Sequence, residues 1–297
     1  MANRSMVSSA GLLALFLMAP AVAEPPVFTG RIVETFGTFD GRQGVAVDAG
    51  HFYAVNNFRI TQHSREDGTP RVQWDGRSDV DGPLVHLDSG VIHEGRLYAA
   101  HSNYPHWPMT SSVEIWDAES LEHVESISFG IDLGSMTWVD RHDGYWWGAF
   151  GNYDKIQGGQ NHPYGETRHT QVVQLDEAFG VLRRWTFPPE LLDRMRPMSN
   201  SGGSWGPDGL LYITGHDYPE IYVVELPSSG SMLQWIATVE VEGLNGQGIA
   251  WDRSTDQRML WGILKQKRHV HRMEIPPVTT SSVRPDYRRW PGDFATD

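Results

Sequence analysis

Three short segments place Asn or Asp directly before Tyr, each after a short apolar run rich in aromatic residues. They are "HSNYPH" (101–106), "FGNYDK" (150–155) and "GHDYPE" (215–220). Histidine titrates near neutral pH, and a neighbouring carboxylate can orient its ring or raise its pKa. We therefore take three residues as candidate catalytic groups: His101, His216 and Asp217. The alternative is that both imidazoles only form hydrogen bonds to neighbouring loops.

Other polar side chains occupy similar positions and are candidates for binding a substrate. The tyrosines could stack on a sugar ring or donate a proton, or could instead pack between neighbouring loops. A lysine could neutralise a substrate carboxylate. The candidate substrate-binding residues are Asp88, Asn57, Asn103, Tyr104, Asn152, Tyr153, Tyr218, Gln247 and Lys265.

The histidines and aspartates of this set are also suitable metal ligands. None of them shows the tight spacing of an HExxH helix or an EF-hand loop, so a divalent metal stays open as a cofactor and its ligands stay unassigned. The sequence contains no phosphate-binding loop and no dinucleotide fingerprint. We therefore expect no other cofactor.

A repeated unit of short strands must position these side chains. The units contain five corresponding glycines, which lie 46, 44, 69 and 45 residues apart: Gly44, Gly90, Gly134, Gly203 and Gly248. Four short strands per unit at this spacing are typical of propeller blades, and the register across five units favours a propeller over a sandwich. Glycine suits inner strands that crowd around an axis. We predict an all-β, five-bladed β-propeller that forms a single domain over residues 24–297.

Two departures from the repeat have a structural interpretation. The fifth unit lacks an outer strand, and "GRIVETF" (30–36) could supply it, so that the N-terminal strand closes the ring and pairs an open sheet edge. The long third interval contains 154–170, which predicts an elaborated loop in blade 3, with His162 and His169 as lid residues. A short helix is expected at "PELLDRMR" (189–196).

The repeat also predicts where the polar segments meet. In an antiparallel blade, the start of the innermost strand and the end of the second strand lie on the same face. The Asn/Asp-Tyr segments end second strands, so their side chains should converge around the axis. Because the five tips differ in sequence, we expect one asymmetric central pocket rather than five equivalent sites.

Composition and the N-terminus indicate where the protein acts. Residues 1–23 resemble a secretory signal peptide, with Arg4, an apolar stretch and "AVA" before Glu24. We expect cleavage near Ala23 and a periplasmic or secreted protein without membrane insertion. The net charge of −13 disfavours nucleic acid as a partner, and the absence of cysteine excludes disulfides. We expect a monomer that binds a small-molecule or saccharide ligand.

The rhythm of the blades resembles that of the plant-type glutaminyl cyclases. The similar segments are "VETFGTFDGRQGVAVD" (33–48), "GSWGPDGLLYITGHDYPEIYVVEL" (203–226) and "LNGQGIAWD" (244–252). The resemblance implies a five-bladed architecture. It does not extend to the cyclase activity, because the acidic residues expected before the glycines that start the strands are largely replaced, as by Gln43 and Gln247.

The sequence thus predicts an exported β-propeller enzyme with a central His/Asp/Asn/Lys pocket. It would act on a small polar, sugar-like or carboxylate-bearing substrate by acid–base chemistry, as a lyase, cyclase or hydrolase. The alternative is a non-catalytic propeller that binds a ligand or carbohydrate in the same pocket. Shifted pKa values in the pocket would favour catalysis, whereas a pocket of unshifted amides and tyrosines would favour binding.

Overall fold

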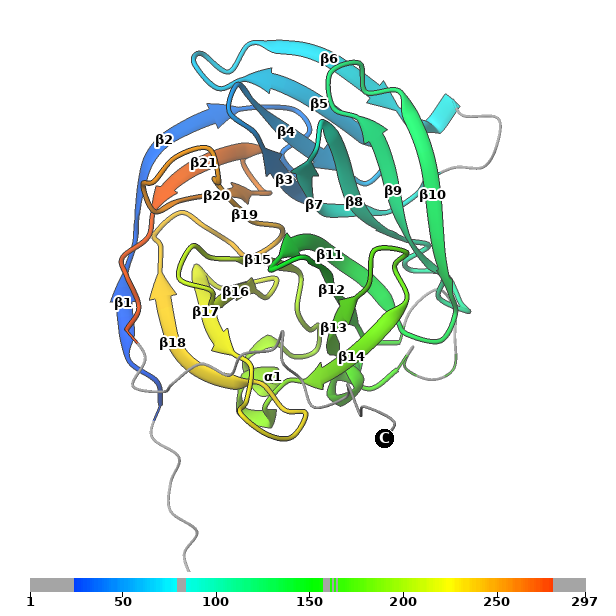
Figure 1. Ribbon diagram of the computed structural model, residues 1–297, viewed down its shortest axis with the longest axis vertical. Coiled ribbons are helices and arrows are strands. Elements are labelled where there is room, and N and C mark those ends of the chain that lie inside the picture. The colour runs from blue at the N-terminus through cyan, green and yellow to red at the C-terminus, as the bar shows by residue number, and fades with distance from the viewer. Residues whose placement is uncertain (1–23, 79–83, 157–160, 162, 164, 280–297) are drawn as a thin grey trace, which may run out of the picture.

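Five β-sheets stand around a central axis in the computed structural model of the chain (Figure 1). The structure describes residues 24–78, 84–156, 161, 163 and 165–279. The predicted all-β, five-bladed propeller is confirmed, and each glycine-marked unit forms one blade. The predicted signal peptide lies outside the described residues.

Each blade runs from an innermost strand at the axis to an outermost strand at the rim. Blade 1 contains β3 (Gly44–Val47), β4 (His51–Asn56), β5 (Arg59–Ser64) and β6 (Pro70–Asp75). Blade 2 contains β7 (Leu87–His93), β8 (Arg96–Ser102), β9 (Ser111–Asp117) and β10 (His123–Gly130). Blade 3 contains β11 (Ser135–His142), β12 (Tyr145–Gly151), β13 (Gln171–Leu175) and β14 (Val181–Thr186). Blade 4 contains β15 (Gly202–Trp205), β16 (Leu211–Thr214), β17 (Glu220–Glu225), β18 (Gln234–Glu240) and β1 (Val27–Thr29). Blade 5 contains β19 (Ala250–Trp251), β20 (Met259–Leu264), β21 (His269–Glu274) and β2 (Arg31–Gly37).

The N-terminal strand closes the ring, as predicted. β2 pairs antiparallel with β21, from Arg31 opposite Glu274 to Gly37 opposite His269. Figure 1 shows β2 as the outer strand beside β21. Phe36 of β2 is buried and packs against Phe52 and Trp261, so the closing strand also fills the core between blades 5 and 1.

One pairing was not anticipated from the sequence. β1 adds a fifth strand to blade 4, parallel to β18, with Val27 opposite Thr238 and Thr29 opposite Glu240. A three-residue strand carries too little pattern to be recognised in a sequence. It protects the backbone of β18, which would otherwise be an exposed sheet edge. The N-terminal segment therefore joins blades 4 and 5.

Close approach of the inner strands explains the repeated glycines. A Cβ atom added to Gly248 would lie 2.6 Å from the Cα of Gly44 and 2.6 Å from the Cβ of Ser89. The backbone N–H of Gly248 donates to the carbonyl of Gln43, which joins blades 5 and 1 directly at the axis. Any larger side chain at this position would push the inner strands of three blades apart.

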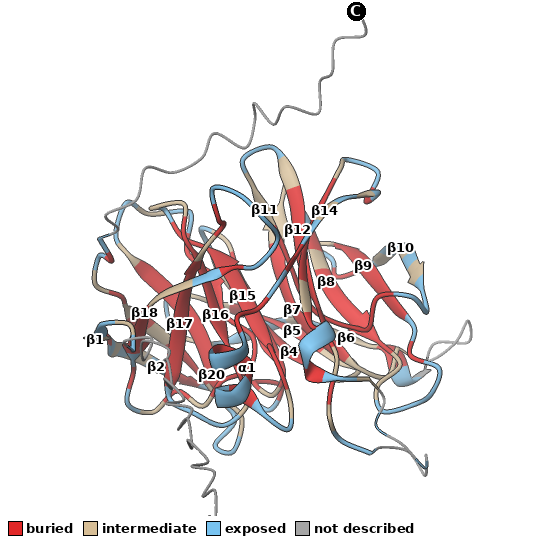
Figure 2. Cartoon of the chain, turned by 90° about the horizontal axis from the view of Figure 1, so that it is seen from below, coloured by how far each residue is buried: buried red, intermediate tan, exposed pale blue. Residues whose placement is uncertain are grey.

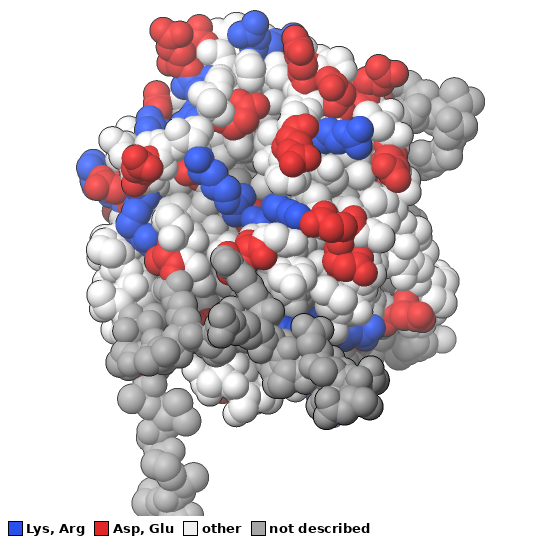
Figure 3. All heavy atoms as spheres, in the orientation of Figure 1, with Lys and Arg blue, Asp and Glu red and all other residues white. Residues whose placement is uncertain are grey.

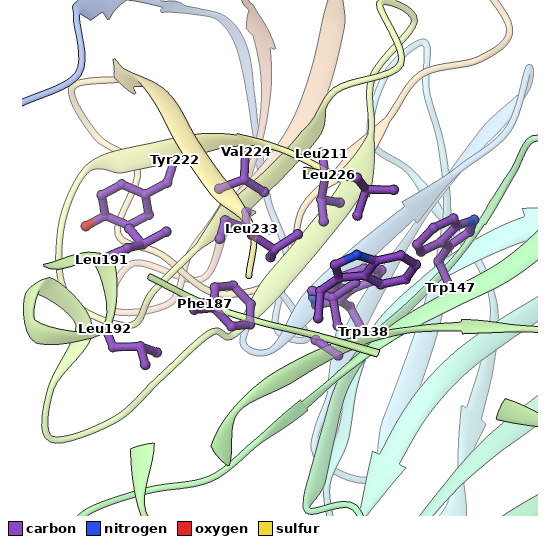
Figure 4. Packing of buried hydrophobic residues seen from close by; sticks show 14 of the residues in the cluster. Trp138, Trp147, Phe187, Leu191, Leu192, Leu211, Tyr222, Val224, Leu226 and Leu233 are labelled. Atoms are coloured by element: carbon purple, nitrogen blue, oxygen red, sulfur yellow. The ribbon is translucent and has the colours of Figure 1, made fainter. Parts of the chain in front are cut away.

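Apolar side chains fill the spaces between blades. Figure 4 shows the largest cluster, where Trp138 and Trp147 of blade 3 meet leucines and Val224 of blade 4. Leu191 and Leu192 belong to α1 (Pro189–Met195), the helix expected in this region, and pack into the same cluster. Figure 2 shows the buried residues concentrated in the strands and the exposed ones in the connections.

Charged side chains of both signs are interspersed on the face of the molecule that Figure 3 shows. Some ion pairs link neighbouring blades. Arg258 of blade 5 lies 2.9 Å from Asp208 of blade 4, and Arg65 of blade 1 pairs with Asp252 of blade 5. The second pair joins the first and last blades of the ring, which are far apart in the chain.

The connections on the pocket face fit the predicted elaboration of blade 3. β12 ends at Gly151 and β13 begins at Gln171, and this connection contains a 3-10 helix at Thr167–His169. α1 lies in the connection from β14 to β15. A second 3-10 helix, Gly76–Ser78, follows β6. No helix in the described part of the chain is long and apolar enough to cross a membrane.

Candidate functional site

A polar pocket of about 110 Å³ opens on the axis where the inner strands begin. All five blades contribute residues to its wall. The described residues that line it are Gln43, His86, Asp88, Tyr104, Thr137, Tyr153, Met198, Ser201, His216, Gln247 and Lys265. The pocket thus brings together six of the predicted site residues: Asp88, Tyr104, Tyr153, His216, Gln247 and Lys265.

His86 and Asp88 form the titratable wall of blade 2. Asp88 is the second residue of β7, and its Oδ2 lies 3.5 Å from Nε2 of His86. The two residues share a face because side chains alternate along an extended chain. Asp88 is 4% exposed, so its carboxyl group is removed from water. His86 was not identified from the sequence, although its position two residues before Asp88 was a usable signal.

The ring of His216 is held in one tautomer. Nδ1 lies 3.2 Å from the carbonyl oxygen of Ser199, which can only accept a hydrogen bond. Nδ1 therefore carries the proton and donates it. In the neutral ring, Nε2 is then left with its lone pair. The loop after β16 positions this ring at the pocket wall.

Lys265 supplies the positive charge of the pocket. It follows the end of β20, and its Nζ donates to Oε1 of Gln43 at 3.5 Å. The Gln43 amide in turn donates to Oδ1 of Asn57. Asn57 therefore stands behind Gln43 and orients it, while Gln43 and Lys265 face the pocket. Lys265 is the one Lys or Arg among the described lining residues.

Two tyrosines connect the two histidines along the wall. The ring of Tyr104 lies 4.9 Å from that of His86 and 5.6 Å from that of Tyr153, measured between centroids. Tyr153 is buried and meets His216 edge-on at 6.4 Å. The four rings therefore form a continuous chain of aromatic contacts along the wall.

Burial sets the protonation states in the pocket. Together with a smaller effect of the Lys265 charge, it lowers the pKa of His86 to about 3 and that of His216 to about 4. Burial raises the pKa of the Asp88 carboxyl well above its usual range, against the opposing effect of Lys265. Burial also lowers the pKa of Lys265. Near neutral pH both imidazoles are therefore neutral bases beside a carboxyl group that holds its proton unusually well.

The backbone at Gln247 is strained. Its φ is 68°, in the left-handed region that residues other than glycine rarely adopt. Its N–H donates to the carbonyl of Gly215, and its carbonyl accepts from Oγ1 of Thr214 at 2.5 Å. These bonds hold Gln247 against the pocket, and strain of this kind is concentrated at functional sites.

His101 does not line the pocket. Its Nε2 accepts from the backbone N–H of Val85 at 3.3 Å, and its Nδ1 lies 3.0 Å from Oγ of Ser112. Ser112 donates to the buried carboxylate of Glu114, which also binds His123. Both ring nitrogens of His101 are thus engaged behind the segment that carries His86.

Asn103 and Asn152 also lie away from the pocket. The Asn103 amide donates to the carbonyl of Pro108 and accepts from the N–H of Thr110, which fixes the loop after β8. The Asn152 amide donates to the carbonyls of Leu133 and His169. Both side chains are used to satisfy loop backbone.

The remaining predicted residues lie nearer the surface. Asp217 and Tyr218 are exposed on the rim beyond His216, and Tyr218 meets the guanidinium of Arg194 at 5.6 Å. His169, one of the two predicted lid residues, is exposed at the end of its 3-10 helix. His162, the other, lies outside the described residues.

Sequence analysis did not assign a role to the five other lining residues: Gln43, His86, Thr137, Met198 and Ser201. Thr137 lies two residues after Ser135, the first residue of β11, but the pairing with β12 is irregular between Met136 and Trp138, so strand alternation gave no signal for it. Met198 follows α1 in an irregular connection, where the sequence carries no periodic signal. Within the described residues, no group of three or more His, Asp or Glu side chains could hold a metal ion.

Comparisons with known proteins show no relative in sequence. No family model matches the chain, and no curated protein matches its sequence. A PQQ-bound aldose sugar dehydrogenase from Streptomyces coelicolor is 11% identical, with 88% of this chain and 85% of that chain covered and a TM-score of 0.49.

Two other solved structures are more distant. A luciferin-regenerating enzyme is 11% identical, covers 80% of this chain and 91% of its own, and has a TM-score of 0.45. A streptogramin B lyase is 9% identical, with 82% of this chain and 97% of that chain covered and a TM-score of 0.41. Proteins this distant do not identify the function of the pocket. The resemblance to glutaminyl cyclases stays a prediction.

Proposed function

We propose that this protein is an enzyme that transfers protons to and from a small, carboxylate-bearing substrate in the central pocket. The observation that carries the proposal is the convergence of His86, Asp88, His216 and Lys265 on one cavity. The pKa values of all four groups are moved from their ordinary values by burial. Such a cluster in a pocket is typical of catalytic sites.

His216 serves as the general base. Its Nδ1–H is held by the carbonyl of Ser199, so the lone pair of Nε2 is free to take a proton from the substrate. The low pKa means that the base is unprotonated throughout the neutral range. The same low pKa makes it a weak base, so it is suited to a proton that the substrate or a nearby positive charge has already acidified.

Asp88 serves as the general acid, and Lys265 binds the substrate carboxylate. The raised pKa of Asp88 lets a carboxyl group keep its proton at a pH where most would lose it. His86, 3.5 Å away, can pass a proton to Asp88 or receive one from it. Burial removes water from the Lys265 ammonium, and an anionic substrate would compensate by pairing with its charge.

The alternative is a pocket that binds without catalysis. The amides of Gln43 and Gln247 and the hydroxyls of Thr137 and Ser201 favour it, because they supply hydrogen bonds but no titration near neutral pH. The four groups with shifted pKa values favour catalysis over this alternative.

Export through the N-terminal segment remains a proposal, and its test is N-terminal sequencing of the protein from its native host.

The test is a turnover screen with matched variants. Small carboxylates, lactones and sugar acids would be incubated with the wild type, His216→Gln and Lys265→Met, and followed by NMR. We expect a compound that the wild type converts and that His216→Gln converts about 100-fold or more slowly, since positioned proton transfer contributes about 10²–10⁴-fold. A compound that binds in the pocket without conversion would support the alternative. Equal turnover by the wild type and His216→Gln would refute the assigned base.

A further inference from the structure

Thr137 lines the central pocket and carries a hydroxyl group without a hydrogen-bond partner among the described residues. It is the third residue of β11, is 2% exposed and lines the cavity. Its Oγ1 has no hydrogen-bond partner among the described residues. Buried polar side-chain atoms are mostly hydrogen-bonded, and one left unpaired destabilises the folded state.

The contrast with its neighbour shows that the strand does not require this arrangement. Ser135 lies two residues nearer the start of β11, before the irregularity in the β11–β12 pairing between Met136 and Trp138, and its hydroxyl is paired with that of Ser102 at 2.8 Å. The protein therefore satisfies one hydroxyl of this strand internally. The hydroxyl of Thr137 is left unpaired at the wall of the pocket.

Position in the ring separates Thr137 from the cation of the pocket. Thr137 comes from blade 3 and Lys265 from blade 5, and these blades are not neighbours in the ring. A ligand can therefore contact both only by lying across the cavity. It needs a negative charge for Lys265 and an oxygen that accepts a hydrogen bond from Thr137.

The cavity limits the size of the part that enters. Its volume is about 110 Å³. It is well below the ~300–1,000 Å³ of pockets for drug-sized ligands. The inner end of the ligand is therefore a group of a few non-hydrogen atoms.

We propose that the central pocket binds a small hydroxy- or oxo-carboxylate, with its carboxylate on Lys265 and its second oxygen on Oγ1 of Thr137. This inference rests on the proposed function and narrows its substrate class. Thr137 is then the residue that distinguishes such an acid from a plain carboxylate of the same size. His216 and Asp88 remain free to exchange protons with the carbon or oxygen held between the two contacts.

The test compares two acids that differ by one hydroxyl group. Binding of acetate and of glycolate would be measured by calorimetry and NMR titration for the wild type, Thr137→Val, Thr137→Ser and Lys265→Met. We expect the wild type to prefer glycolate about tenfold, the equivalent of one hydrogen bond of about 1.4 kcal/mol. Thr137→Val should bind both acids equally, Thr137→Ser should keep the preference, and Lys265→Met should bind neither.

Thermal unfolding distinguishes a ligand contact from a structural role. Val has nearly the shape of Thr and removes an unpaired buried hydroxyl, so Thr137→Val should be at least as stable as the wild type. Lower stability of Thr137→Val would overturn the inference, as would a glycolate preference that survives in it or failure of both acids to bind the wild type. If His216-dependent turnover persists in those cases, only this inference fails and the proposed function stands.

Discussion

Acid should destabilise this protein in part through His216, because the folded chain resists protonating it. The ring titrates near its ordinary value of 6.5 in the unfolded chain and at a pKa of about 4 in the folded one. Between these values the unfolded chain binds a proton that the folded chain does not. The contribution of His216 to stability is therefore complete above pH ~6.5 and is lost as the pH falls towards ~4.

The expected size follows from the shift. Over the 2 pH units from about 6.5 to about 4.5, each unit corresponds to 1.36 kcal/mol, which gives an upper limit of about 2.7 kcal/mol. Water reaches part of the half-buried ring and reduces this to roughly 1–2 kcal/mol. In His216→Gln no proton is taken up at this position, so the loss of stability between pH ~7.5 and ~4.5 should be smaller by that amount.

Urea unfolding at both pH values measures the difference. The other titrating groups are present in both proteins, so their contributions cancel in the comparison. His169→Gln is the matched control, because its ring is exposed in the folded protein, and it should lose as much stability as the wild type. If His216→Gln loses as much stability in acid as the wild type and this control, the ring is not kept neutral by burial and the reasoning is refuted.

Three further outcomes are expected. Gly248→Ala should destabilise the fold by about 1–3 kcal/mol in urea titrations, because its Cβ would meet backbone of the neighbouring blade at 2.6 Å. Gly37→Ala is the control: its Cβ would have open space around it, so stability should change by less than about 0.5 kcal/mol. Phe36→Ala should cost about 3 kcal/mol or more, since this buried ring fixes the closing strand; an unchanged unfolding midpoint would mean that closure does not depend on it. Lys265→Met should raise the pKa of His216, since the ammonium lowers it, and a histidine titration by NMR that shows no rise would exclude this electrostatic coupling.

The ring of blades followed from local pattern. The spacing of the glycines, the alternation of the strands and the unpaired "GRIVETF" segment are each visible in the sequence, and the structure has the five sheets and the closing strand that they predict. These features can be predicted because a strand's period and a glycine's small size are properties of the residues themselves. The pairing of β1 with β18 was not visible, since three residues carry no such period.

The polar tips were less predictable than the blades. The sequence indicated that polar side chains gather on one face, but Asn103 and Asn152 bind loop carbonyls there and His101 binds the backbone of Val85. A side-chain amide or imidazole serves backbone and ligand equally well. Which one it serves depends on the course of the loop, and no periodicity encodes that course.

Sequence alone therefore determined the five-bladed ring, its closure by the N-terminal strand and the face on which chemistry would be sought. Only the tertiary structure decided which side chains enter the cavity: His86, Asp88, His216 and Lys265 come from three different blades and meet there. It also decided their protonation, since the pKa of His216 and that of Asp88 depend on how much water the surrounding blades exclude. The physical reason is range. Strand periodicity acts between adjacent residues, whereas desolvation and charge act between residues far apart in the chain.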